Sequence, residues 1–114
     1  MKAYTDIEQS KKLAEFLPLE SADMRYAPFG DTHPWVWTDT FIEKDATPCW
    51  SLAALLGLMP RIEHLKPFID LSPKLDSEEV AIYYHSEDSP YIVRDNLVDA
   101  CYEMIVKLHE QNIL

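Results

Sequence analysis

The stretch TPCWSLAALLGLMP, residues Thr47 to Pro60, decides how the rest of the chain is interpreted. Thr47 is a suitable N-cap, and Pro48 suits the first helical position, where the missing N–H and the fixed φ carry no penalty. Residues 49–59 are apolar on nearly every side of a helix, whereas a surface helix has a polar face. We therefore predict a buried helix that starts at Thr47 and serves as the central packing element.

Before this helix, the sequence predicts a surface helix followed by a strand pair. Thr5 and Glu8 have the capping-box spacing at the start of the helix, and Pro18 ends it by disfavouring helical geometry at the preceding residue. Two segments then have the character of strands, residues 22–28 and residues 35–41, with a turn-rich loop between them. We expect these two strands to pair antiparallel.

After the central helix, the sequence predicts a short extended piece, a hairpin and a last helix. The extended piece covers residues 68–71, and the hairpin joins VAIYYH to YIVRD through the polar turn SEDSP. Asp95 is the expected N-cap of the last helix. The apolar face of that helix consists of Leu97, Cys101, Met104, Ile105 and Leu108. We expect this face to pack on the sheet.

This order of elements predicts the fold class. Strands that pair locally between helices indicate an α+β fold with an antiparallel sheet of about four strands and three helices. A chain of 114 residues is about one ordinary domain and buries roughly two-thirds of its unfolded surface. We therefore predict that residues 1–114 form a single α+β domain.

The charge of the chain restricts its partners. Twenty acidic and ten basic residues give a net charge of −10, which repels nucleic-acid phosphates. We therefore expect no direct binding of nucleic acid. The acidic residues either only keep the protein in solution, or form a face that docks on a basic partner, or imitate the phosphates of DNA to inhibit a DNA-binding protein.

The sequence also predicts the compartment. MKAYTDIEQS lacks the apolar run of a signal peptide, and no segment approaches the ~20 apolar residues of a membrane span. We therefore expect a cytoplasmic protein that does not enter membranes. The two cysteines, Cys49 and Cys101, form no C-x-x-C pair, and in a reducing compartment both should be free thiols.

Three segments carry a resemblance to a known group of proteins. They are QSKKLAEFLPLESADMRY, TPCWSLAALLGLMP and RDNLVDACYEMIVKLHEQNIL. The chain resembles small uncharacterised proteins encoded by phages, prophages and related mobile elements of gut Bacteroidetes. The resemblance implies an α+β fold, a cytoplasmic setting and an unassigned role, and it supplies no active-site residues.

One catalytic interpretation needs to be weighed. A cysteine in the first turn of a helix lies near the positive end of the helix dipole, which stabilises a thiolate. His85 and Asp95, at the ends of two later strands, then offer a base and an orienting group to a Cys49 nucleophile. Against this stand the missing glycine-rich approach of papain-like peptidases and the apolar surroundings of Cys49, since burial makes a thiol inert.

Other chemistries lack their motifs. No H-E-x-x-H or C-x-x-C spacing is present to hold a metal, and the chain's two glycines are too few for a P-loop or a dinucleotide fingerprint. We therefore assign no catalytic, cofactor-binding or metal-binding residue, and we expect no cofactor.

The leading hypothesis is a non-enzymatic interaction or accessory protein of a phage or mobile element. Its partner is an unknown protein, and the acidic surface favours a basic one. Self-association into a homodimer, through an exposed strand edge or an apolar helix face, is also favoured. The alternatives are a cysteine peptidase or amidase that uses Cys49 and His85, and an acidic DNA mimic.

Overall fold

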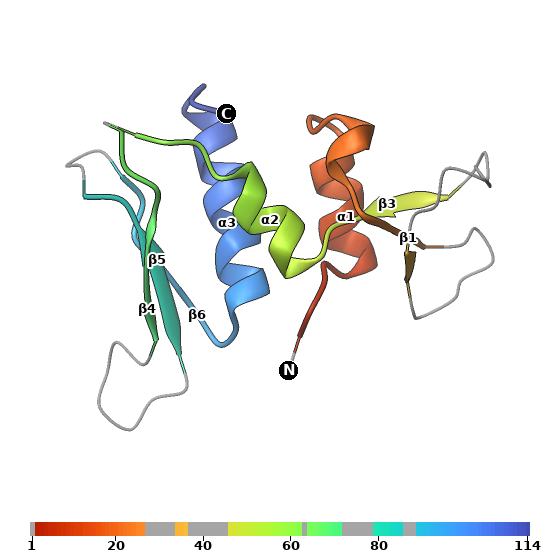
Figure 1. The fold of residues 1–114 in the computed structure, drawn as a ribbon, viewed down its shortest axis with the longest axis horizontal. Coiled ribbons are helices and arrows are strands. Elements are labelled where there is room, and N and C mark those ends of the chain that lie inside the picture. The colour runs from red at the N-terminus through yellow and green to blue at the C-terminus, as the bar shows by residue number, and fades with distance from the viewer. Residues whose placement is uncertain (1, 27–33, 37–45, 63, 72–78, 86–88) are drawn as a thin grey trace.

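The longest described helix, α3 (Leu97–Glu110), is the blue helix to the left of α2 in Figure 1. The structure is a computed structural model, and it describes residues 2–26, 34–36, 46–62, 64–71, 79–85 and 89–114. The other elements are α1 (Ile7–Ala14), a 3-10 turn (Leu19–Ser21), β1 (Met24–Tyr26), β2 (Trp35–Val36), β3 (Thr47–Cys49), α2 (Leu52–Leu58), β4 (Phe68–Leu71), β5 (Val80–Tyr83) and β6 (Ile92–Arg94).

The described strands form two antiparallel sheets, with the helices between them (Figure 1). The first sheet has the order β2-β1-β3, and the second has the order β4-β5-β6. α1 packs beside β3, whereas α3 packs on β5 and β6. The predicted α+β class is confirmed, as is the antiparallel pairing within the early strand pair and the later hairpin. Residues 27–28 and 37–41 of the predicted early strands, and residues 86–88 of the hairpin turn, lie outside the described residues. The strands divide between two sheets, which differs from the expected single sheet.

The division into two sheets follows from the segment that starts at Thr47. Residues 47–49 are not the first turn of a helix, as predicted, but the edge strand β3, which lies antiparallel to β1 with Tyr26 opposite Thr47. Proline is tolerated in an edge strand, because no second neighbour needs its N–H. The helix begins four residues later than predicted, at Leu52, and the Ser51 side chain caps it by accepting a hydrogen bond from the backbone N–H of Ala54. The predicted burial on nearly every side is wrong, because Leu55 is the one buried residue of α2 and Ala53 and Gly57 are exposed.

Two other helix caps are each one residue later than predicted. Asp6, not Thr5, caps α1, and it forms a capping box with Gln9. Thr5 is fully buried, and its hydroxyl accepts a hydrogen bond from the backbone N–H of Trp50 instead. Asn96, not Asp95, caps α3 by accepting a hydrogen bond from the backbone N–H of Asp99. Helix boundaries shift in this way when a neighbouring residue also has capping chemistry.

The core forms around α3. The predicted apolar face of this helix is confirmed, since four of its five residues are fully buried and Leu97 packs against them partly buried. α1 contributes Leu13, the segment around α2 contributes Trp50 and Leu55, and the second sheet contributes Ile82. One continuous apolar cluster therefore joins all three helices to the second sheet.

Burial differs sharply between two cross-strand neighbours of the second sheet, Ile69 and Ile82. They lie opposite each other in the pairing of β4 with β5. Ile82 is fully buried, whereas Ile69 is 39% exposed. The same truncation at the two positions therefore separates the contribution of the core from that of the sheet edge.

We predict that Ile82→Ala lowers the free energy of unfolding by about 2–4 kcal/mol, because it leaves a cavity against the core. Ile69→Ala should cost less than about 1 kcal/mol, because much of that side chain is already in contact with water. Urea titrations followed by circular dichroism measure both. Equal losses at the two positions would contradict this placement of the core.

Candidate interaction surface

Four aromatic side chains share the face of the second sheet that points away from α3. They are Phe68, Tyr83, His85 and Tyr91, which we call the aromatic surface. Phe68 lies directly opposite Tyr83, so both project from the same face of the sheet. His85 follows Tyr83 by two residues, which is the spacing of a shared face.

The four rings form one contiguous cluster, in which Tyr83 contacts each of the other three. The ring centroids of Phe68 and His85 are 4.4 Å apart in an edge-to-face arrangement. Tyr83 lies between the others, with its centroid 6.0 Å from that of Phe68 and 5.3 Å from that of Tyr91. These are typical separations for attractive aromatic pairs. Tyr91 is nevertheless 59% exposed and Phe68 41% exposed, so the cluster presents an open apolar surface.

The other face of the same sheet is part of the core. Ile82 and Ile92 lie opposite each other there and are buried. Tyr84 is buried as well, and its hydroxyl donates a 2.6 Å hydrogen bond to the carbonyl oxygen of Pro60. Burial raises the pKa of Tyr84 to about 12. The tyrosine that the core requires is therefore distinct from the two on the aromatic surface.

β4 is an edge strand with exposed side chains on both faces. In the described part of the chain it pairs only with β5. Its four residues alternate, with Phe68 and Asp70 on the face of the aromatic surface and Ile69 and Leu71 on the opposite face. Leu71 is 69% exposed. An exposed edge strand is a template for pairing with another chain.

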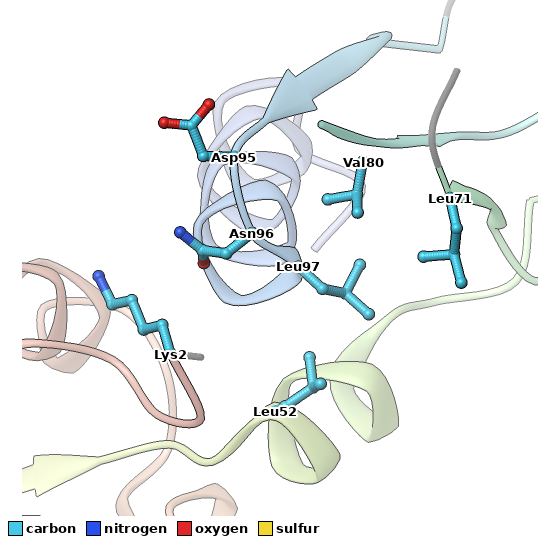
Figure 2. A pocket seen from close by; sticks show the side chains of 7 residues that line it. All are labelled: Lys2, Leu52, Leu71, Val80, Asp95, Asn96 and Leu97. Carbon is cyan, nitrogen blue, oxygen red and sulfur yellow. The ribbon is translucent and has the colours of Figure 1, made fainter. Parts of the chain in front are cut away.

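A cavity of about 420 Å³ lies near the end of β4 (Figure 2). Its apolar wall comes from four different elements and consists of Leu52, Leu71, Val80 and Leu97. Lys2, Asp95 and Asn96 contribute polar groups on one side, as Figure 2 shows. The cavity can accept an apolar side chain or a small amphipathic group, because it is lined mainly by leucine and valine with polar groups at one side.

Lys2 is held beside this cavity by two carboxylates. Its Nζ atom lies 2.7 Å from Asp99 and 3.1 Å from Asp6. Asp99 also accepts hydrogen bonds from the side chains of Gln9 and Asn96. The network ties the N-terminal segment and α1 to the start of α3, where a negative charge is favoured by the helix dipole.

The pKa values of this pair shift in opposite directions. Burial alone would raise the pKa of Asp99, but hydrogen bonds from Lys2, Gln9 and Asn96 lower it below its usual range. Burial alone would lower the pKa of Lys2, but the hydrogen bonds to Asp99 and Asp6 raise it. Both shifts favour the charged forms, so the pair stabilises the fold while both partners are ionised.

Cys49 lies in a closed polar cluster between β3 and α1. The thiol is fully buried and donates a 3.4 Å hydrogen bond to the carbonyl oxygen of Thr5. The hydroxyl of Tyr26 donates to the same carbonyl at 2.6 Å. Burial raises the pKa of the Cys49 thiol, and the hydrogen bonds from Thr5, Ser10 and Tyr26 only partly offset this rise. The arrangement favours a neutral, unreactive thiol.

The structure does not bring Cys49, His85 and Asp95 together. Cys49 ends β3 in the first sheet, whereas His85 follows β5 in the second, and Figure 1 shows the helices between these strands. His85 contacts Phe68 and Tyr83, and Asp95 lies exposed beside the cavity. Cys49 is also in a strand, so it lacks the helix dipole on which the catalytic interpretation depended. The geometry gives a Cys–His–Asp mechanism no support.

Within the described residues, no group of three or more His, Cys, Asp or Glu side chains is placed to hold a metal ion. Within the same residues, no helix combines the length and the apolar character that crossing a bilayer requires. The acidic residues Glu78, Glu87 and Asp88 lie outside the described part of the chain.

Comparisons of the chain with protein families, with curated proteins and with solved structures find no match. The resemblance to phage-encoded proteins therefore stays a prediction.

Neither the aromatic surface nor the cavity is predicted by a pattern in the sequence. The spacing of Tyr83 and His85 in VAIYYH indicates a shared face. The spacing does not indicate which face of the strand packs on α3, because Tyr84 on the opposite face is equally apolar. In the structure, Tyr84 is the buried tyrosine. The cavity joins residues distant in sequence, so no local pattern points to it.

We predict that iodoacetamide labels neither cysteine of the folded protein near neutral pH. Cys49 and Cys101 are both fully buried, and burial raises the pKa of Cys101 to about 12. Mass spectrometry should show two labelled cysteines only after unfolding in guanidinium chloride. Rapid labelling of Cys49 in the folded protein would restore the nucleophile hypothesis.

We predict that Asp99→Asn lowers the free energy of unfolding by about 1 kcal/mol near neutral pH, because it removes a partly buried ion pair. The folded pKa of Asp99 lies below the unfolded value, so this stabilisation is present above the unfolded pKa and is lost as the pH falls through the folded pKa. In urea titrations, the difference from wild type should shrink below about pH 4.

Asp95→Asn is the matched control for this measurement. It removes an exposed carboxylate at the start of the same helix, and it should change the stability by less than about 0.5 kcal/mol at either pH. An Asp99→Asn loss that does not depend on pH would show that the ion pair is not its source.

Proposed function

We propose that this chain is a non-enzymatic interaction protein that binds a basic partner protein through the aromatic surface. The observation that carries the proposal is a cluster of four aromatic rings on one face of the second sheet, with Phe68, His85 and Tyr91 exposed, while the other face supplies the core. Tyrosine is enriched at protein interfaces, because it buries a large area with little loss of conformational freedom.

The charge of the chain supports a basic partner. The net charge of −10 accelerates the encounter with a positively charged protein and slows the encounter with an acidic one. Aromatic faces also attract cationic side chains, so the aromatic surface and the overall charge favour the same kind of partner. A role as an accessory factor of a phage or mobile element, in the cytoplasm, is consistent with this activity.

We predict that the variant Phe68→Ser/Tyr91→Ser loses its partner while it keeps its fold. Tagged wild type should capture a positively charged protein, identified by mass spectrometry and then purified. The Kd measured by calorimetry with purified components should rise at least about tenfold in the variant, because both rings become small polar side chains.

Leu19→Ser is the matched control, because Leu19 is 53% exposed but lies in the 3-10 turn after α1. It should bind the partner as wild type does. An unchanged Kd in the double variant would overturn the proposal, as would capture of nothing but a second copy of the chain.

A further inference from the structure

We infer that the outer edge of β4 is a docking strand for an extended segment of the partner in which cationic and apolar residues alternate. The inference rests on the proposed function and specifies the chemistry of the partner. It joins three features of the structure, which are the edge of β4, the aromatic surface and the cavity beside Leu71.

The edge of β4 provides the backbone interaction. β4 is the terminal strand of the order β4-β5-β6, and within the described residues its backbone pairs on one side only. An extended peptide that pairs with the other side gains main-chain hydrogen bonds, whatever its sequence. The side chains on the two faces of β4 then determine which peptide sequences bind.

The sheet face that carries the aromatic surface favours cationic side chains in the added strand. A residue added beside β4 on this face meets Phe68, Asp70 and the rings behind them. A lysine or arginine there contacts an aromatic ring and lies near the Asp70 carboxylate, and both attract a positive charge. An acidic residue at the same position is repelled by Asp70 and by the negative charge of the whole protein.

The opposite face selects apolar residues. Side chains of the added strand that point to this face meet Ile69 and Leu71, which are 39% and 69% exposed. Leu71 is also a wall of the cavity in Figure 2, together with Val80 and Leu97. A valine or leucine beside Leu71 therefore covers exposed apolar surface and removes it from water.

Charge makes a second copy of the chain the weaker occupant. β4 has the sequence FIDL, which contains an acidic residue and no basic one. Two copies paired through β4 would bring Asp70 carboxylates to the same face and supply no cation to the rings. Two proteins of net charge −10 also repel each other. A basic segment meets none of these penalties.

Short fluorescent peptides test the inference directly. One alternates lysine and valine, a second has the same composition with the lysines and valines in separate blocks, and a third alternates glutamate and valine. Fluorescence anisotropy should show the alternating lysine peptide binding at least about tenfold more tightly than the other two. Equal affinity of the blocked peptide, or of the glutamate peptide, would overturn the inference.

Variants of the protein locate the contact. Asp70→Asn and Glu8→Gln each remove one negative charge, but Glu8 is an exposed residue of α1. Asp70→Asn should weaken the binding of the alternating lysine peptide at least about threefold, and Glu8→Gln should leave its affinity unchanged. Methylating the backbone nitrogens of the peptide should also weaken binding, because it blocks main-chain pairing. An unchanged affinity of the methylated peptide would exclude strand addition.

These outcomes separate the inference from the proposed function. If the purified partner binds wild type but not Phe68→Ser/Tyr91→Ser, while the alternating peptide fails to bind, the aromatic surface is an interface and the strand mechanism is wrong. If the double variant binds the partner as wild type does, the proposed function is wrong as well.

Discussion

The burial of Trp50 is the constraint on which the rest of the structure depends. This residue lies between β3 and α2, so it marks the point where the chain leaves the first sheet and enters the core. Its indole N–H donates a 3.0 Å hydrogen bond to the hydroxyl of Ser21, and its carbonyl accepts the backbone N–H of Thr5 at 2.9 Å. A fully buried indole with its polar group satisfied adds a large apolar area to the core without an orphaned donor.

The elements on either side of Trp50 differ in how well the sequence predicts them. α3 was predictable, because its apolar residues follow a helical period over four turns and the helix packs along its whole length. The segment at Thr47 was not, because Thr47 and Pro48 suit a helix start and an edge strand equally well. The choice between the two is made by β1, which pairs with these residues from more than twenty positions away.

The second sheet shows why a candidate site is harder to predict than a fold. Tyr83, Tyr84 and His85 follow one another in the sequence, and the pleat of a strand sends alternate residues to opposite faces. Local sequence gives the alternation, but packing against α3 decides that Tyr84 is the buried residue. The aromatic surface is therefore a consequence of tertiary structure. Cross-strand aromatic pairs also stabilise a sheet by roughly 0.2–1 kcal/mol, so binding and stability need to be measured separately at these positions.

Charge and apolar area have different roles at such a surface. Long-range attraction from the net charge of −10 mainly raises the rate of association, and salt screens it beyond a Debye length of about 8 Å. The contacts of Phe68 and Tyr91 act only at short range, so they mainly set the lifetime of a complex. Charge alone would attract any basic protein, whereas an edge strand with a different requirement on each face accepts few sequences. Under the proposed function, specificity for one partner would come from β4 and its neighbours, and the acidic residues elsewhere would determine how quickly that partner is found.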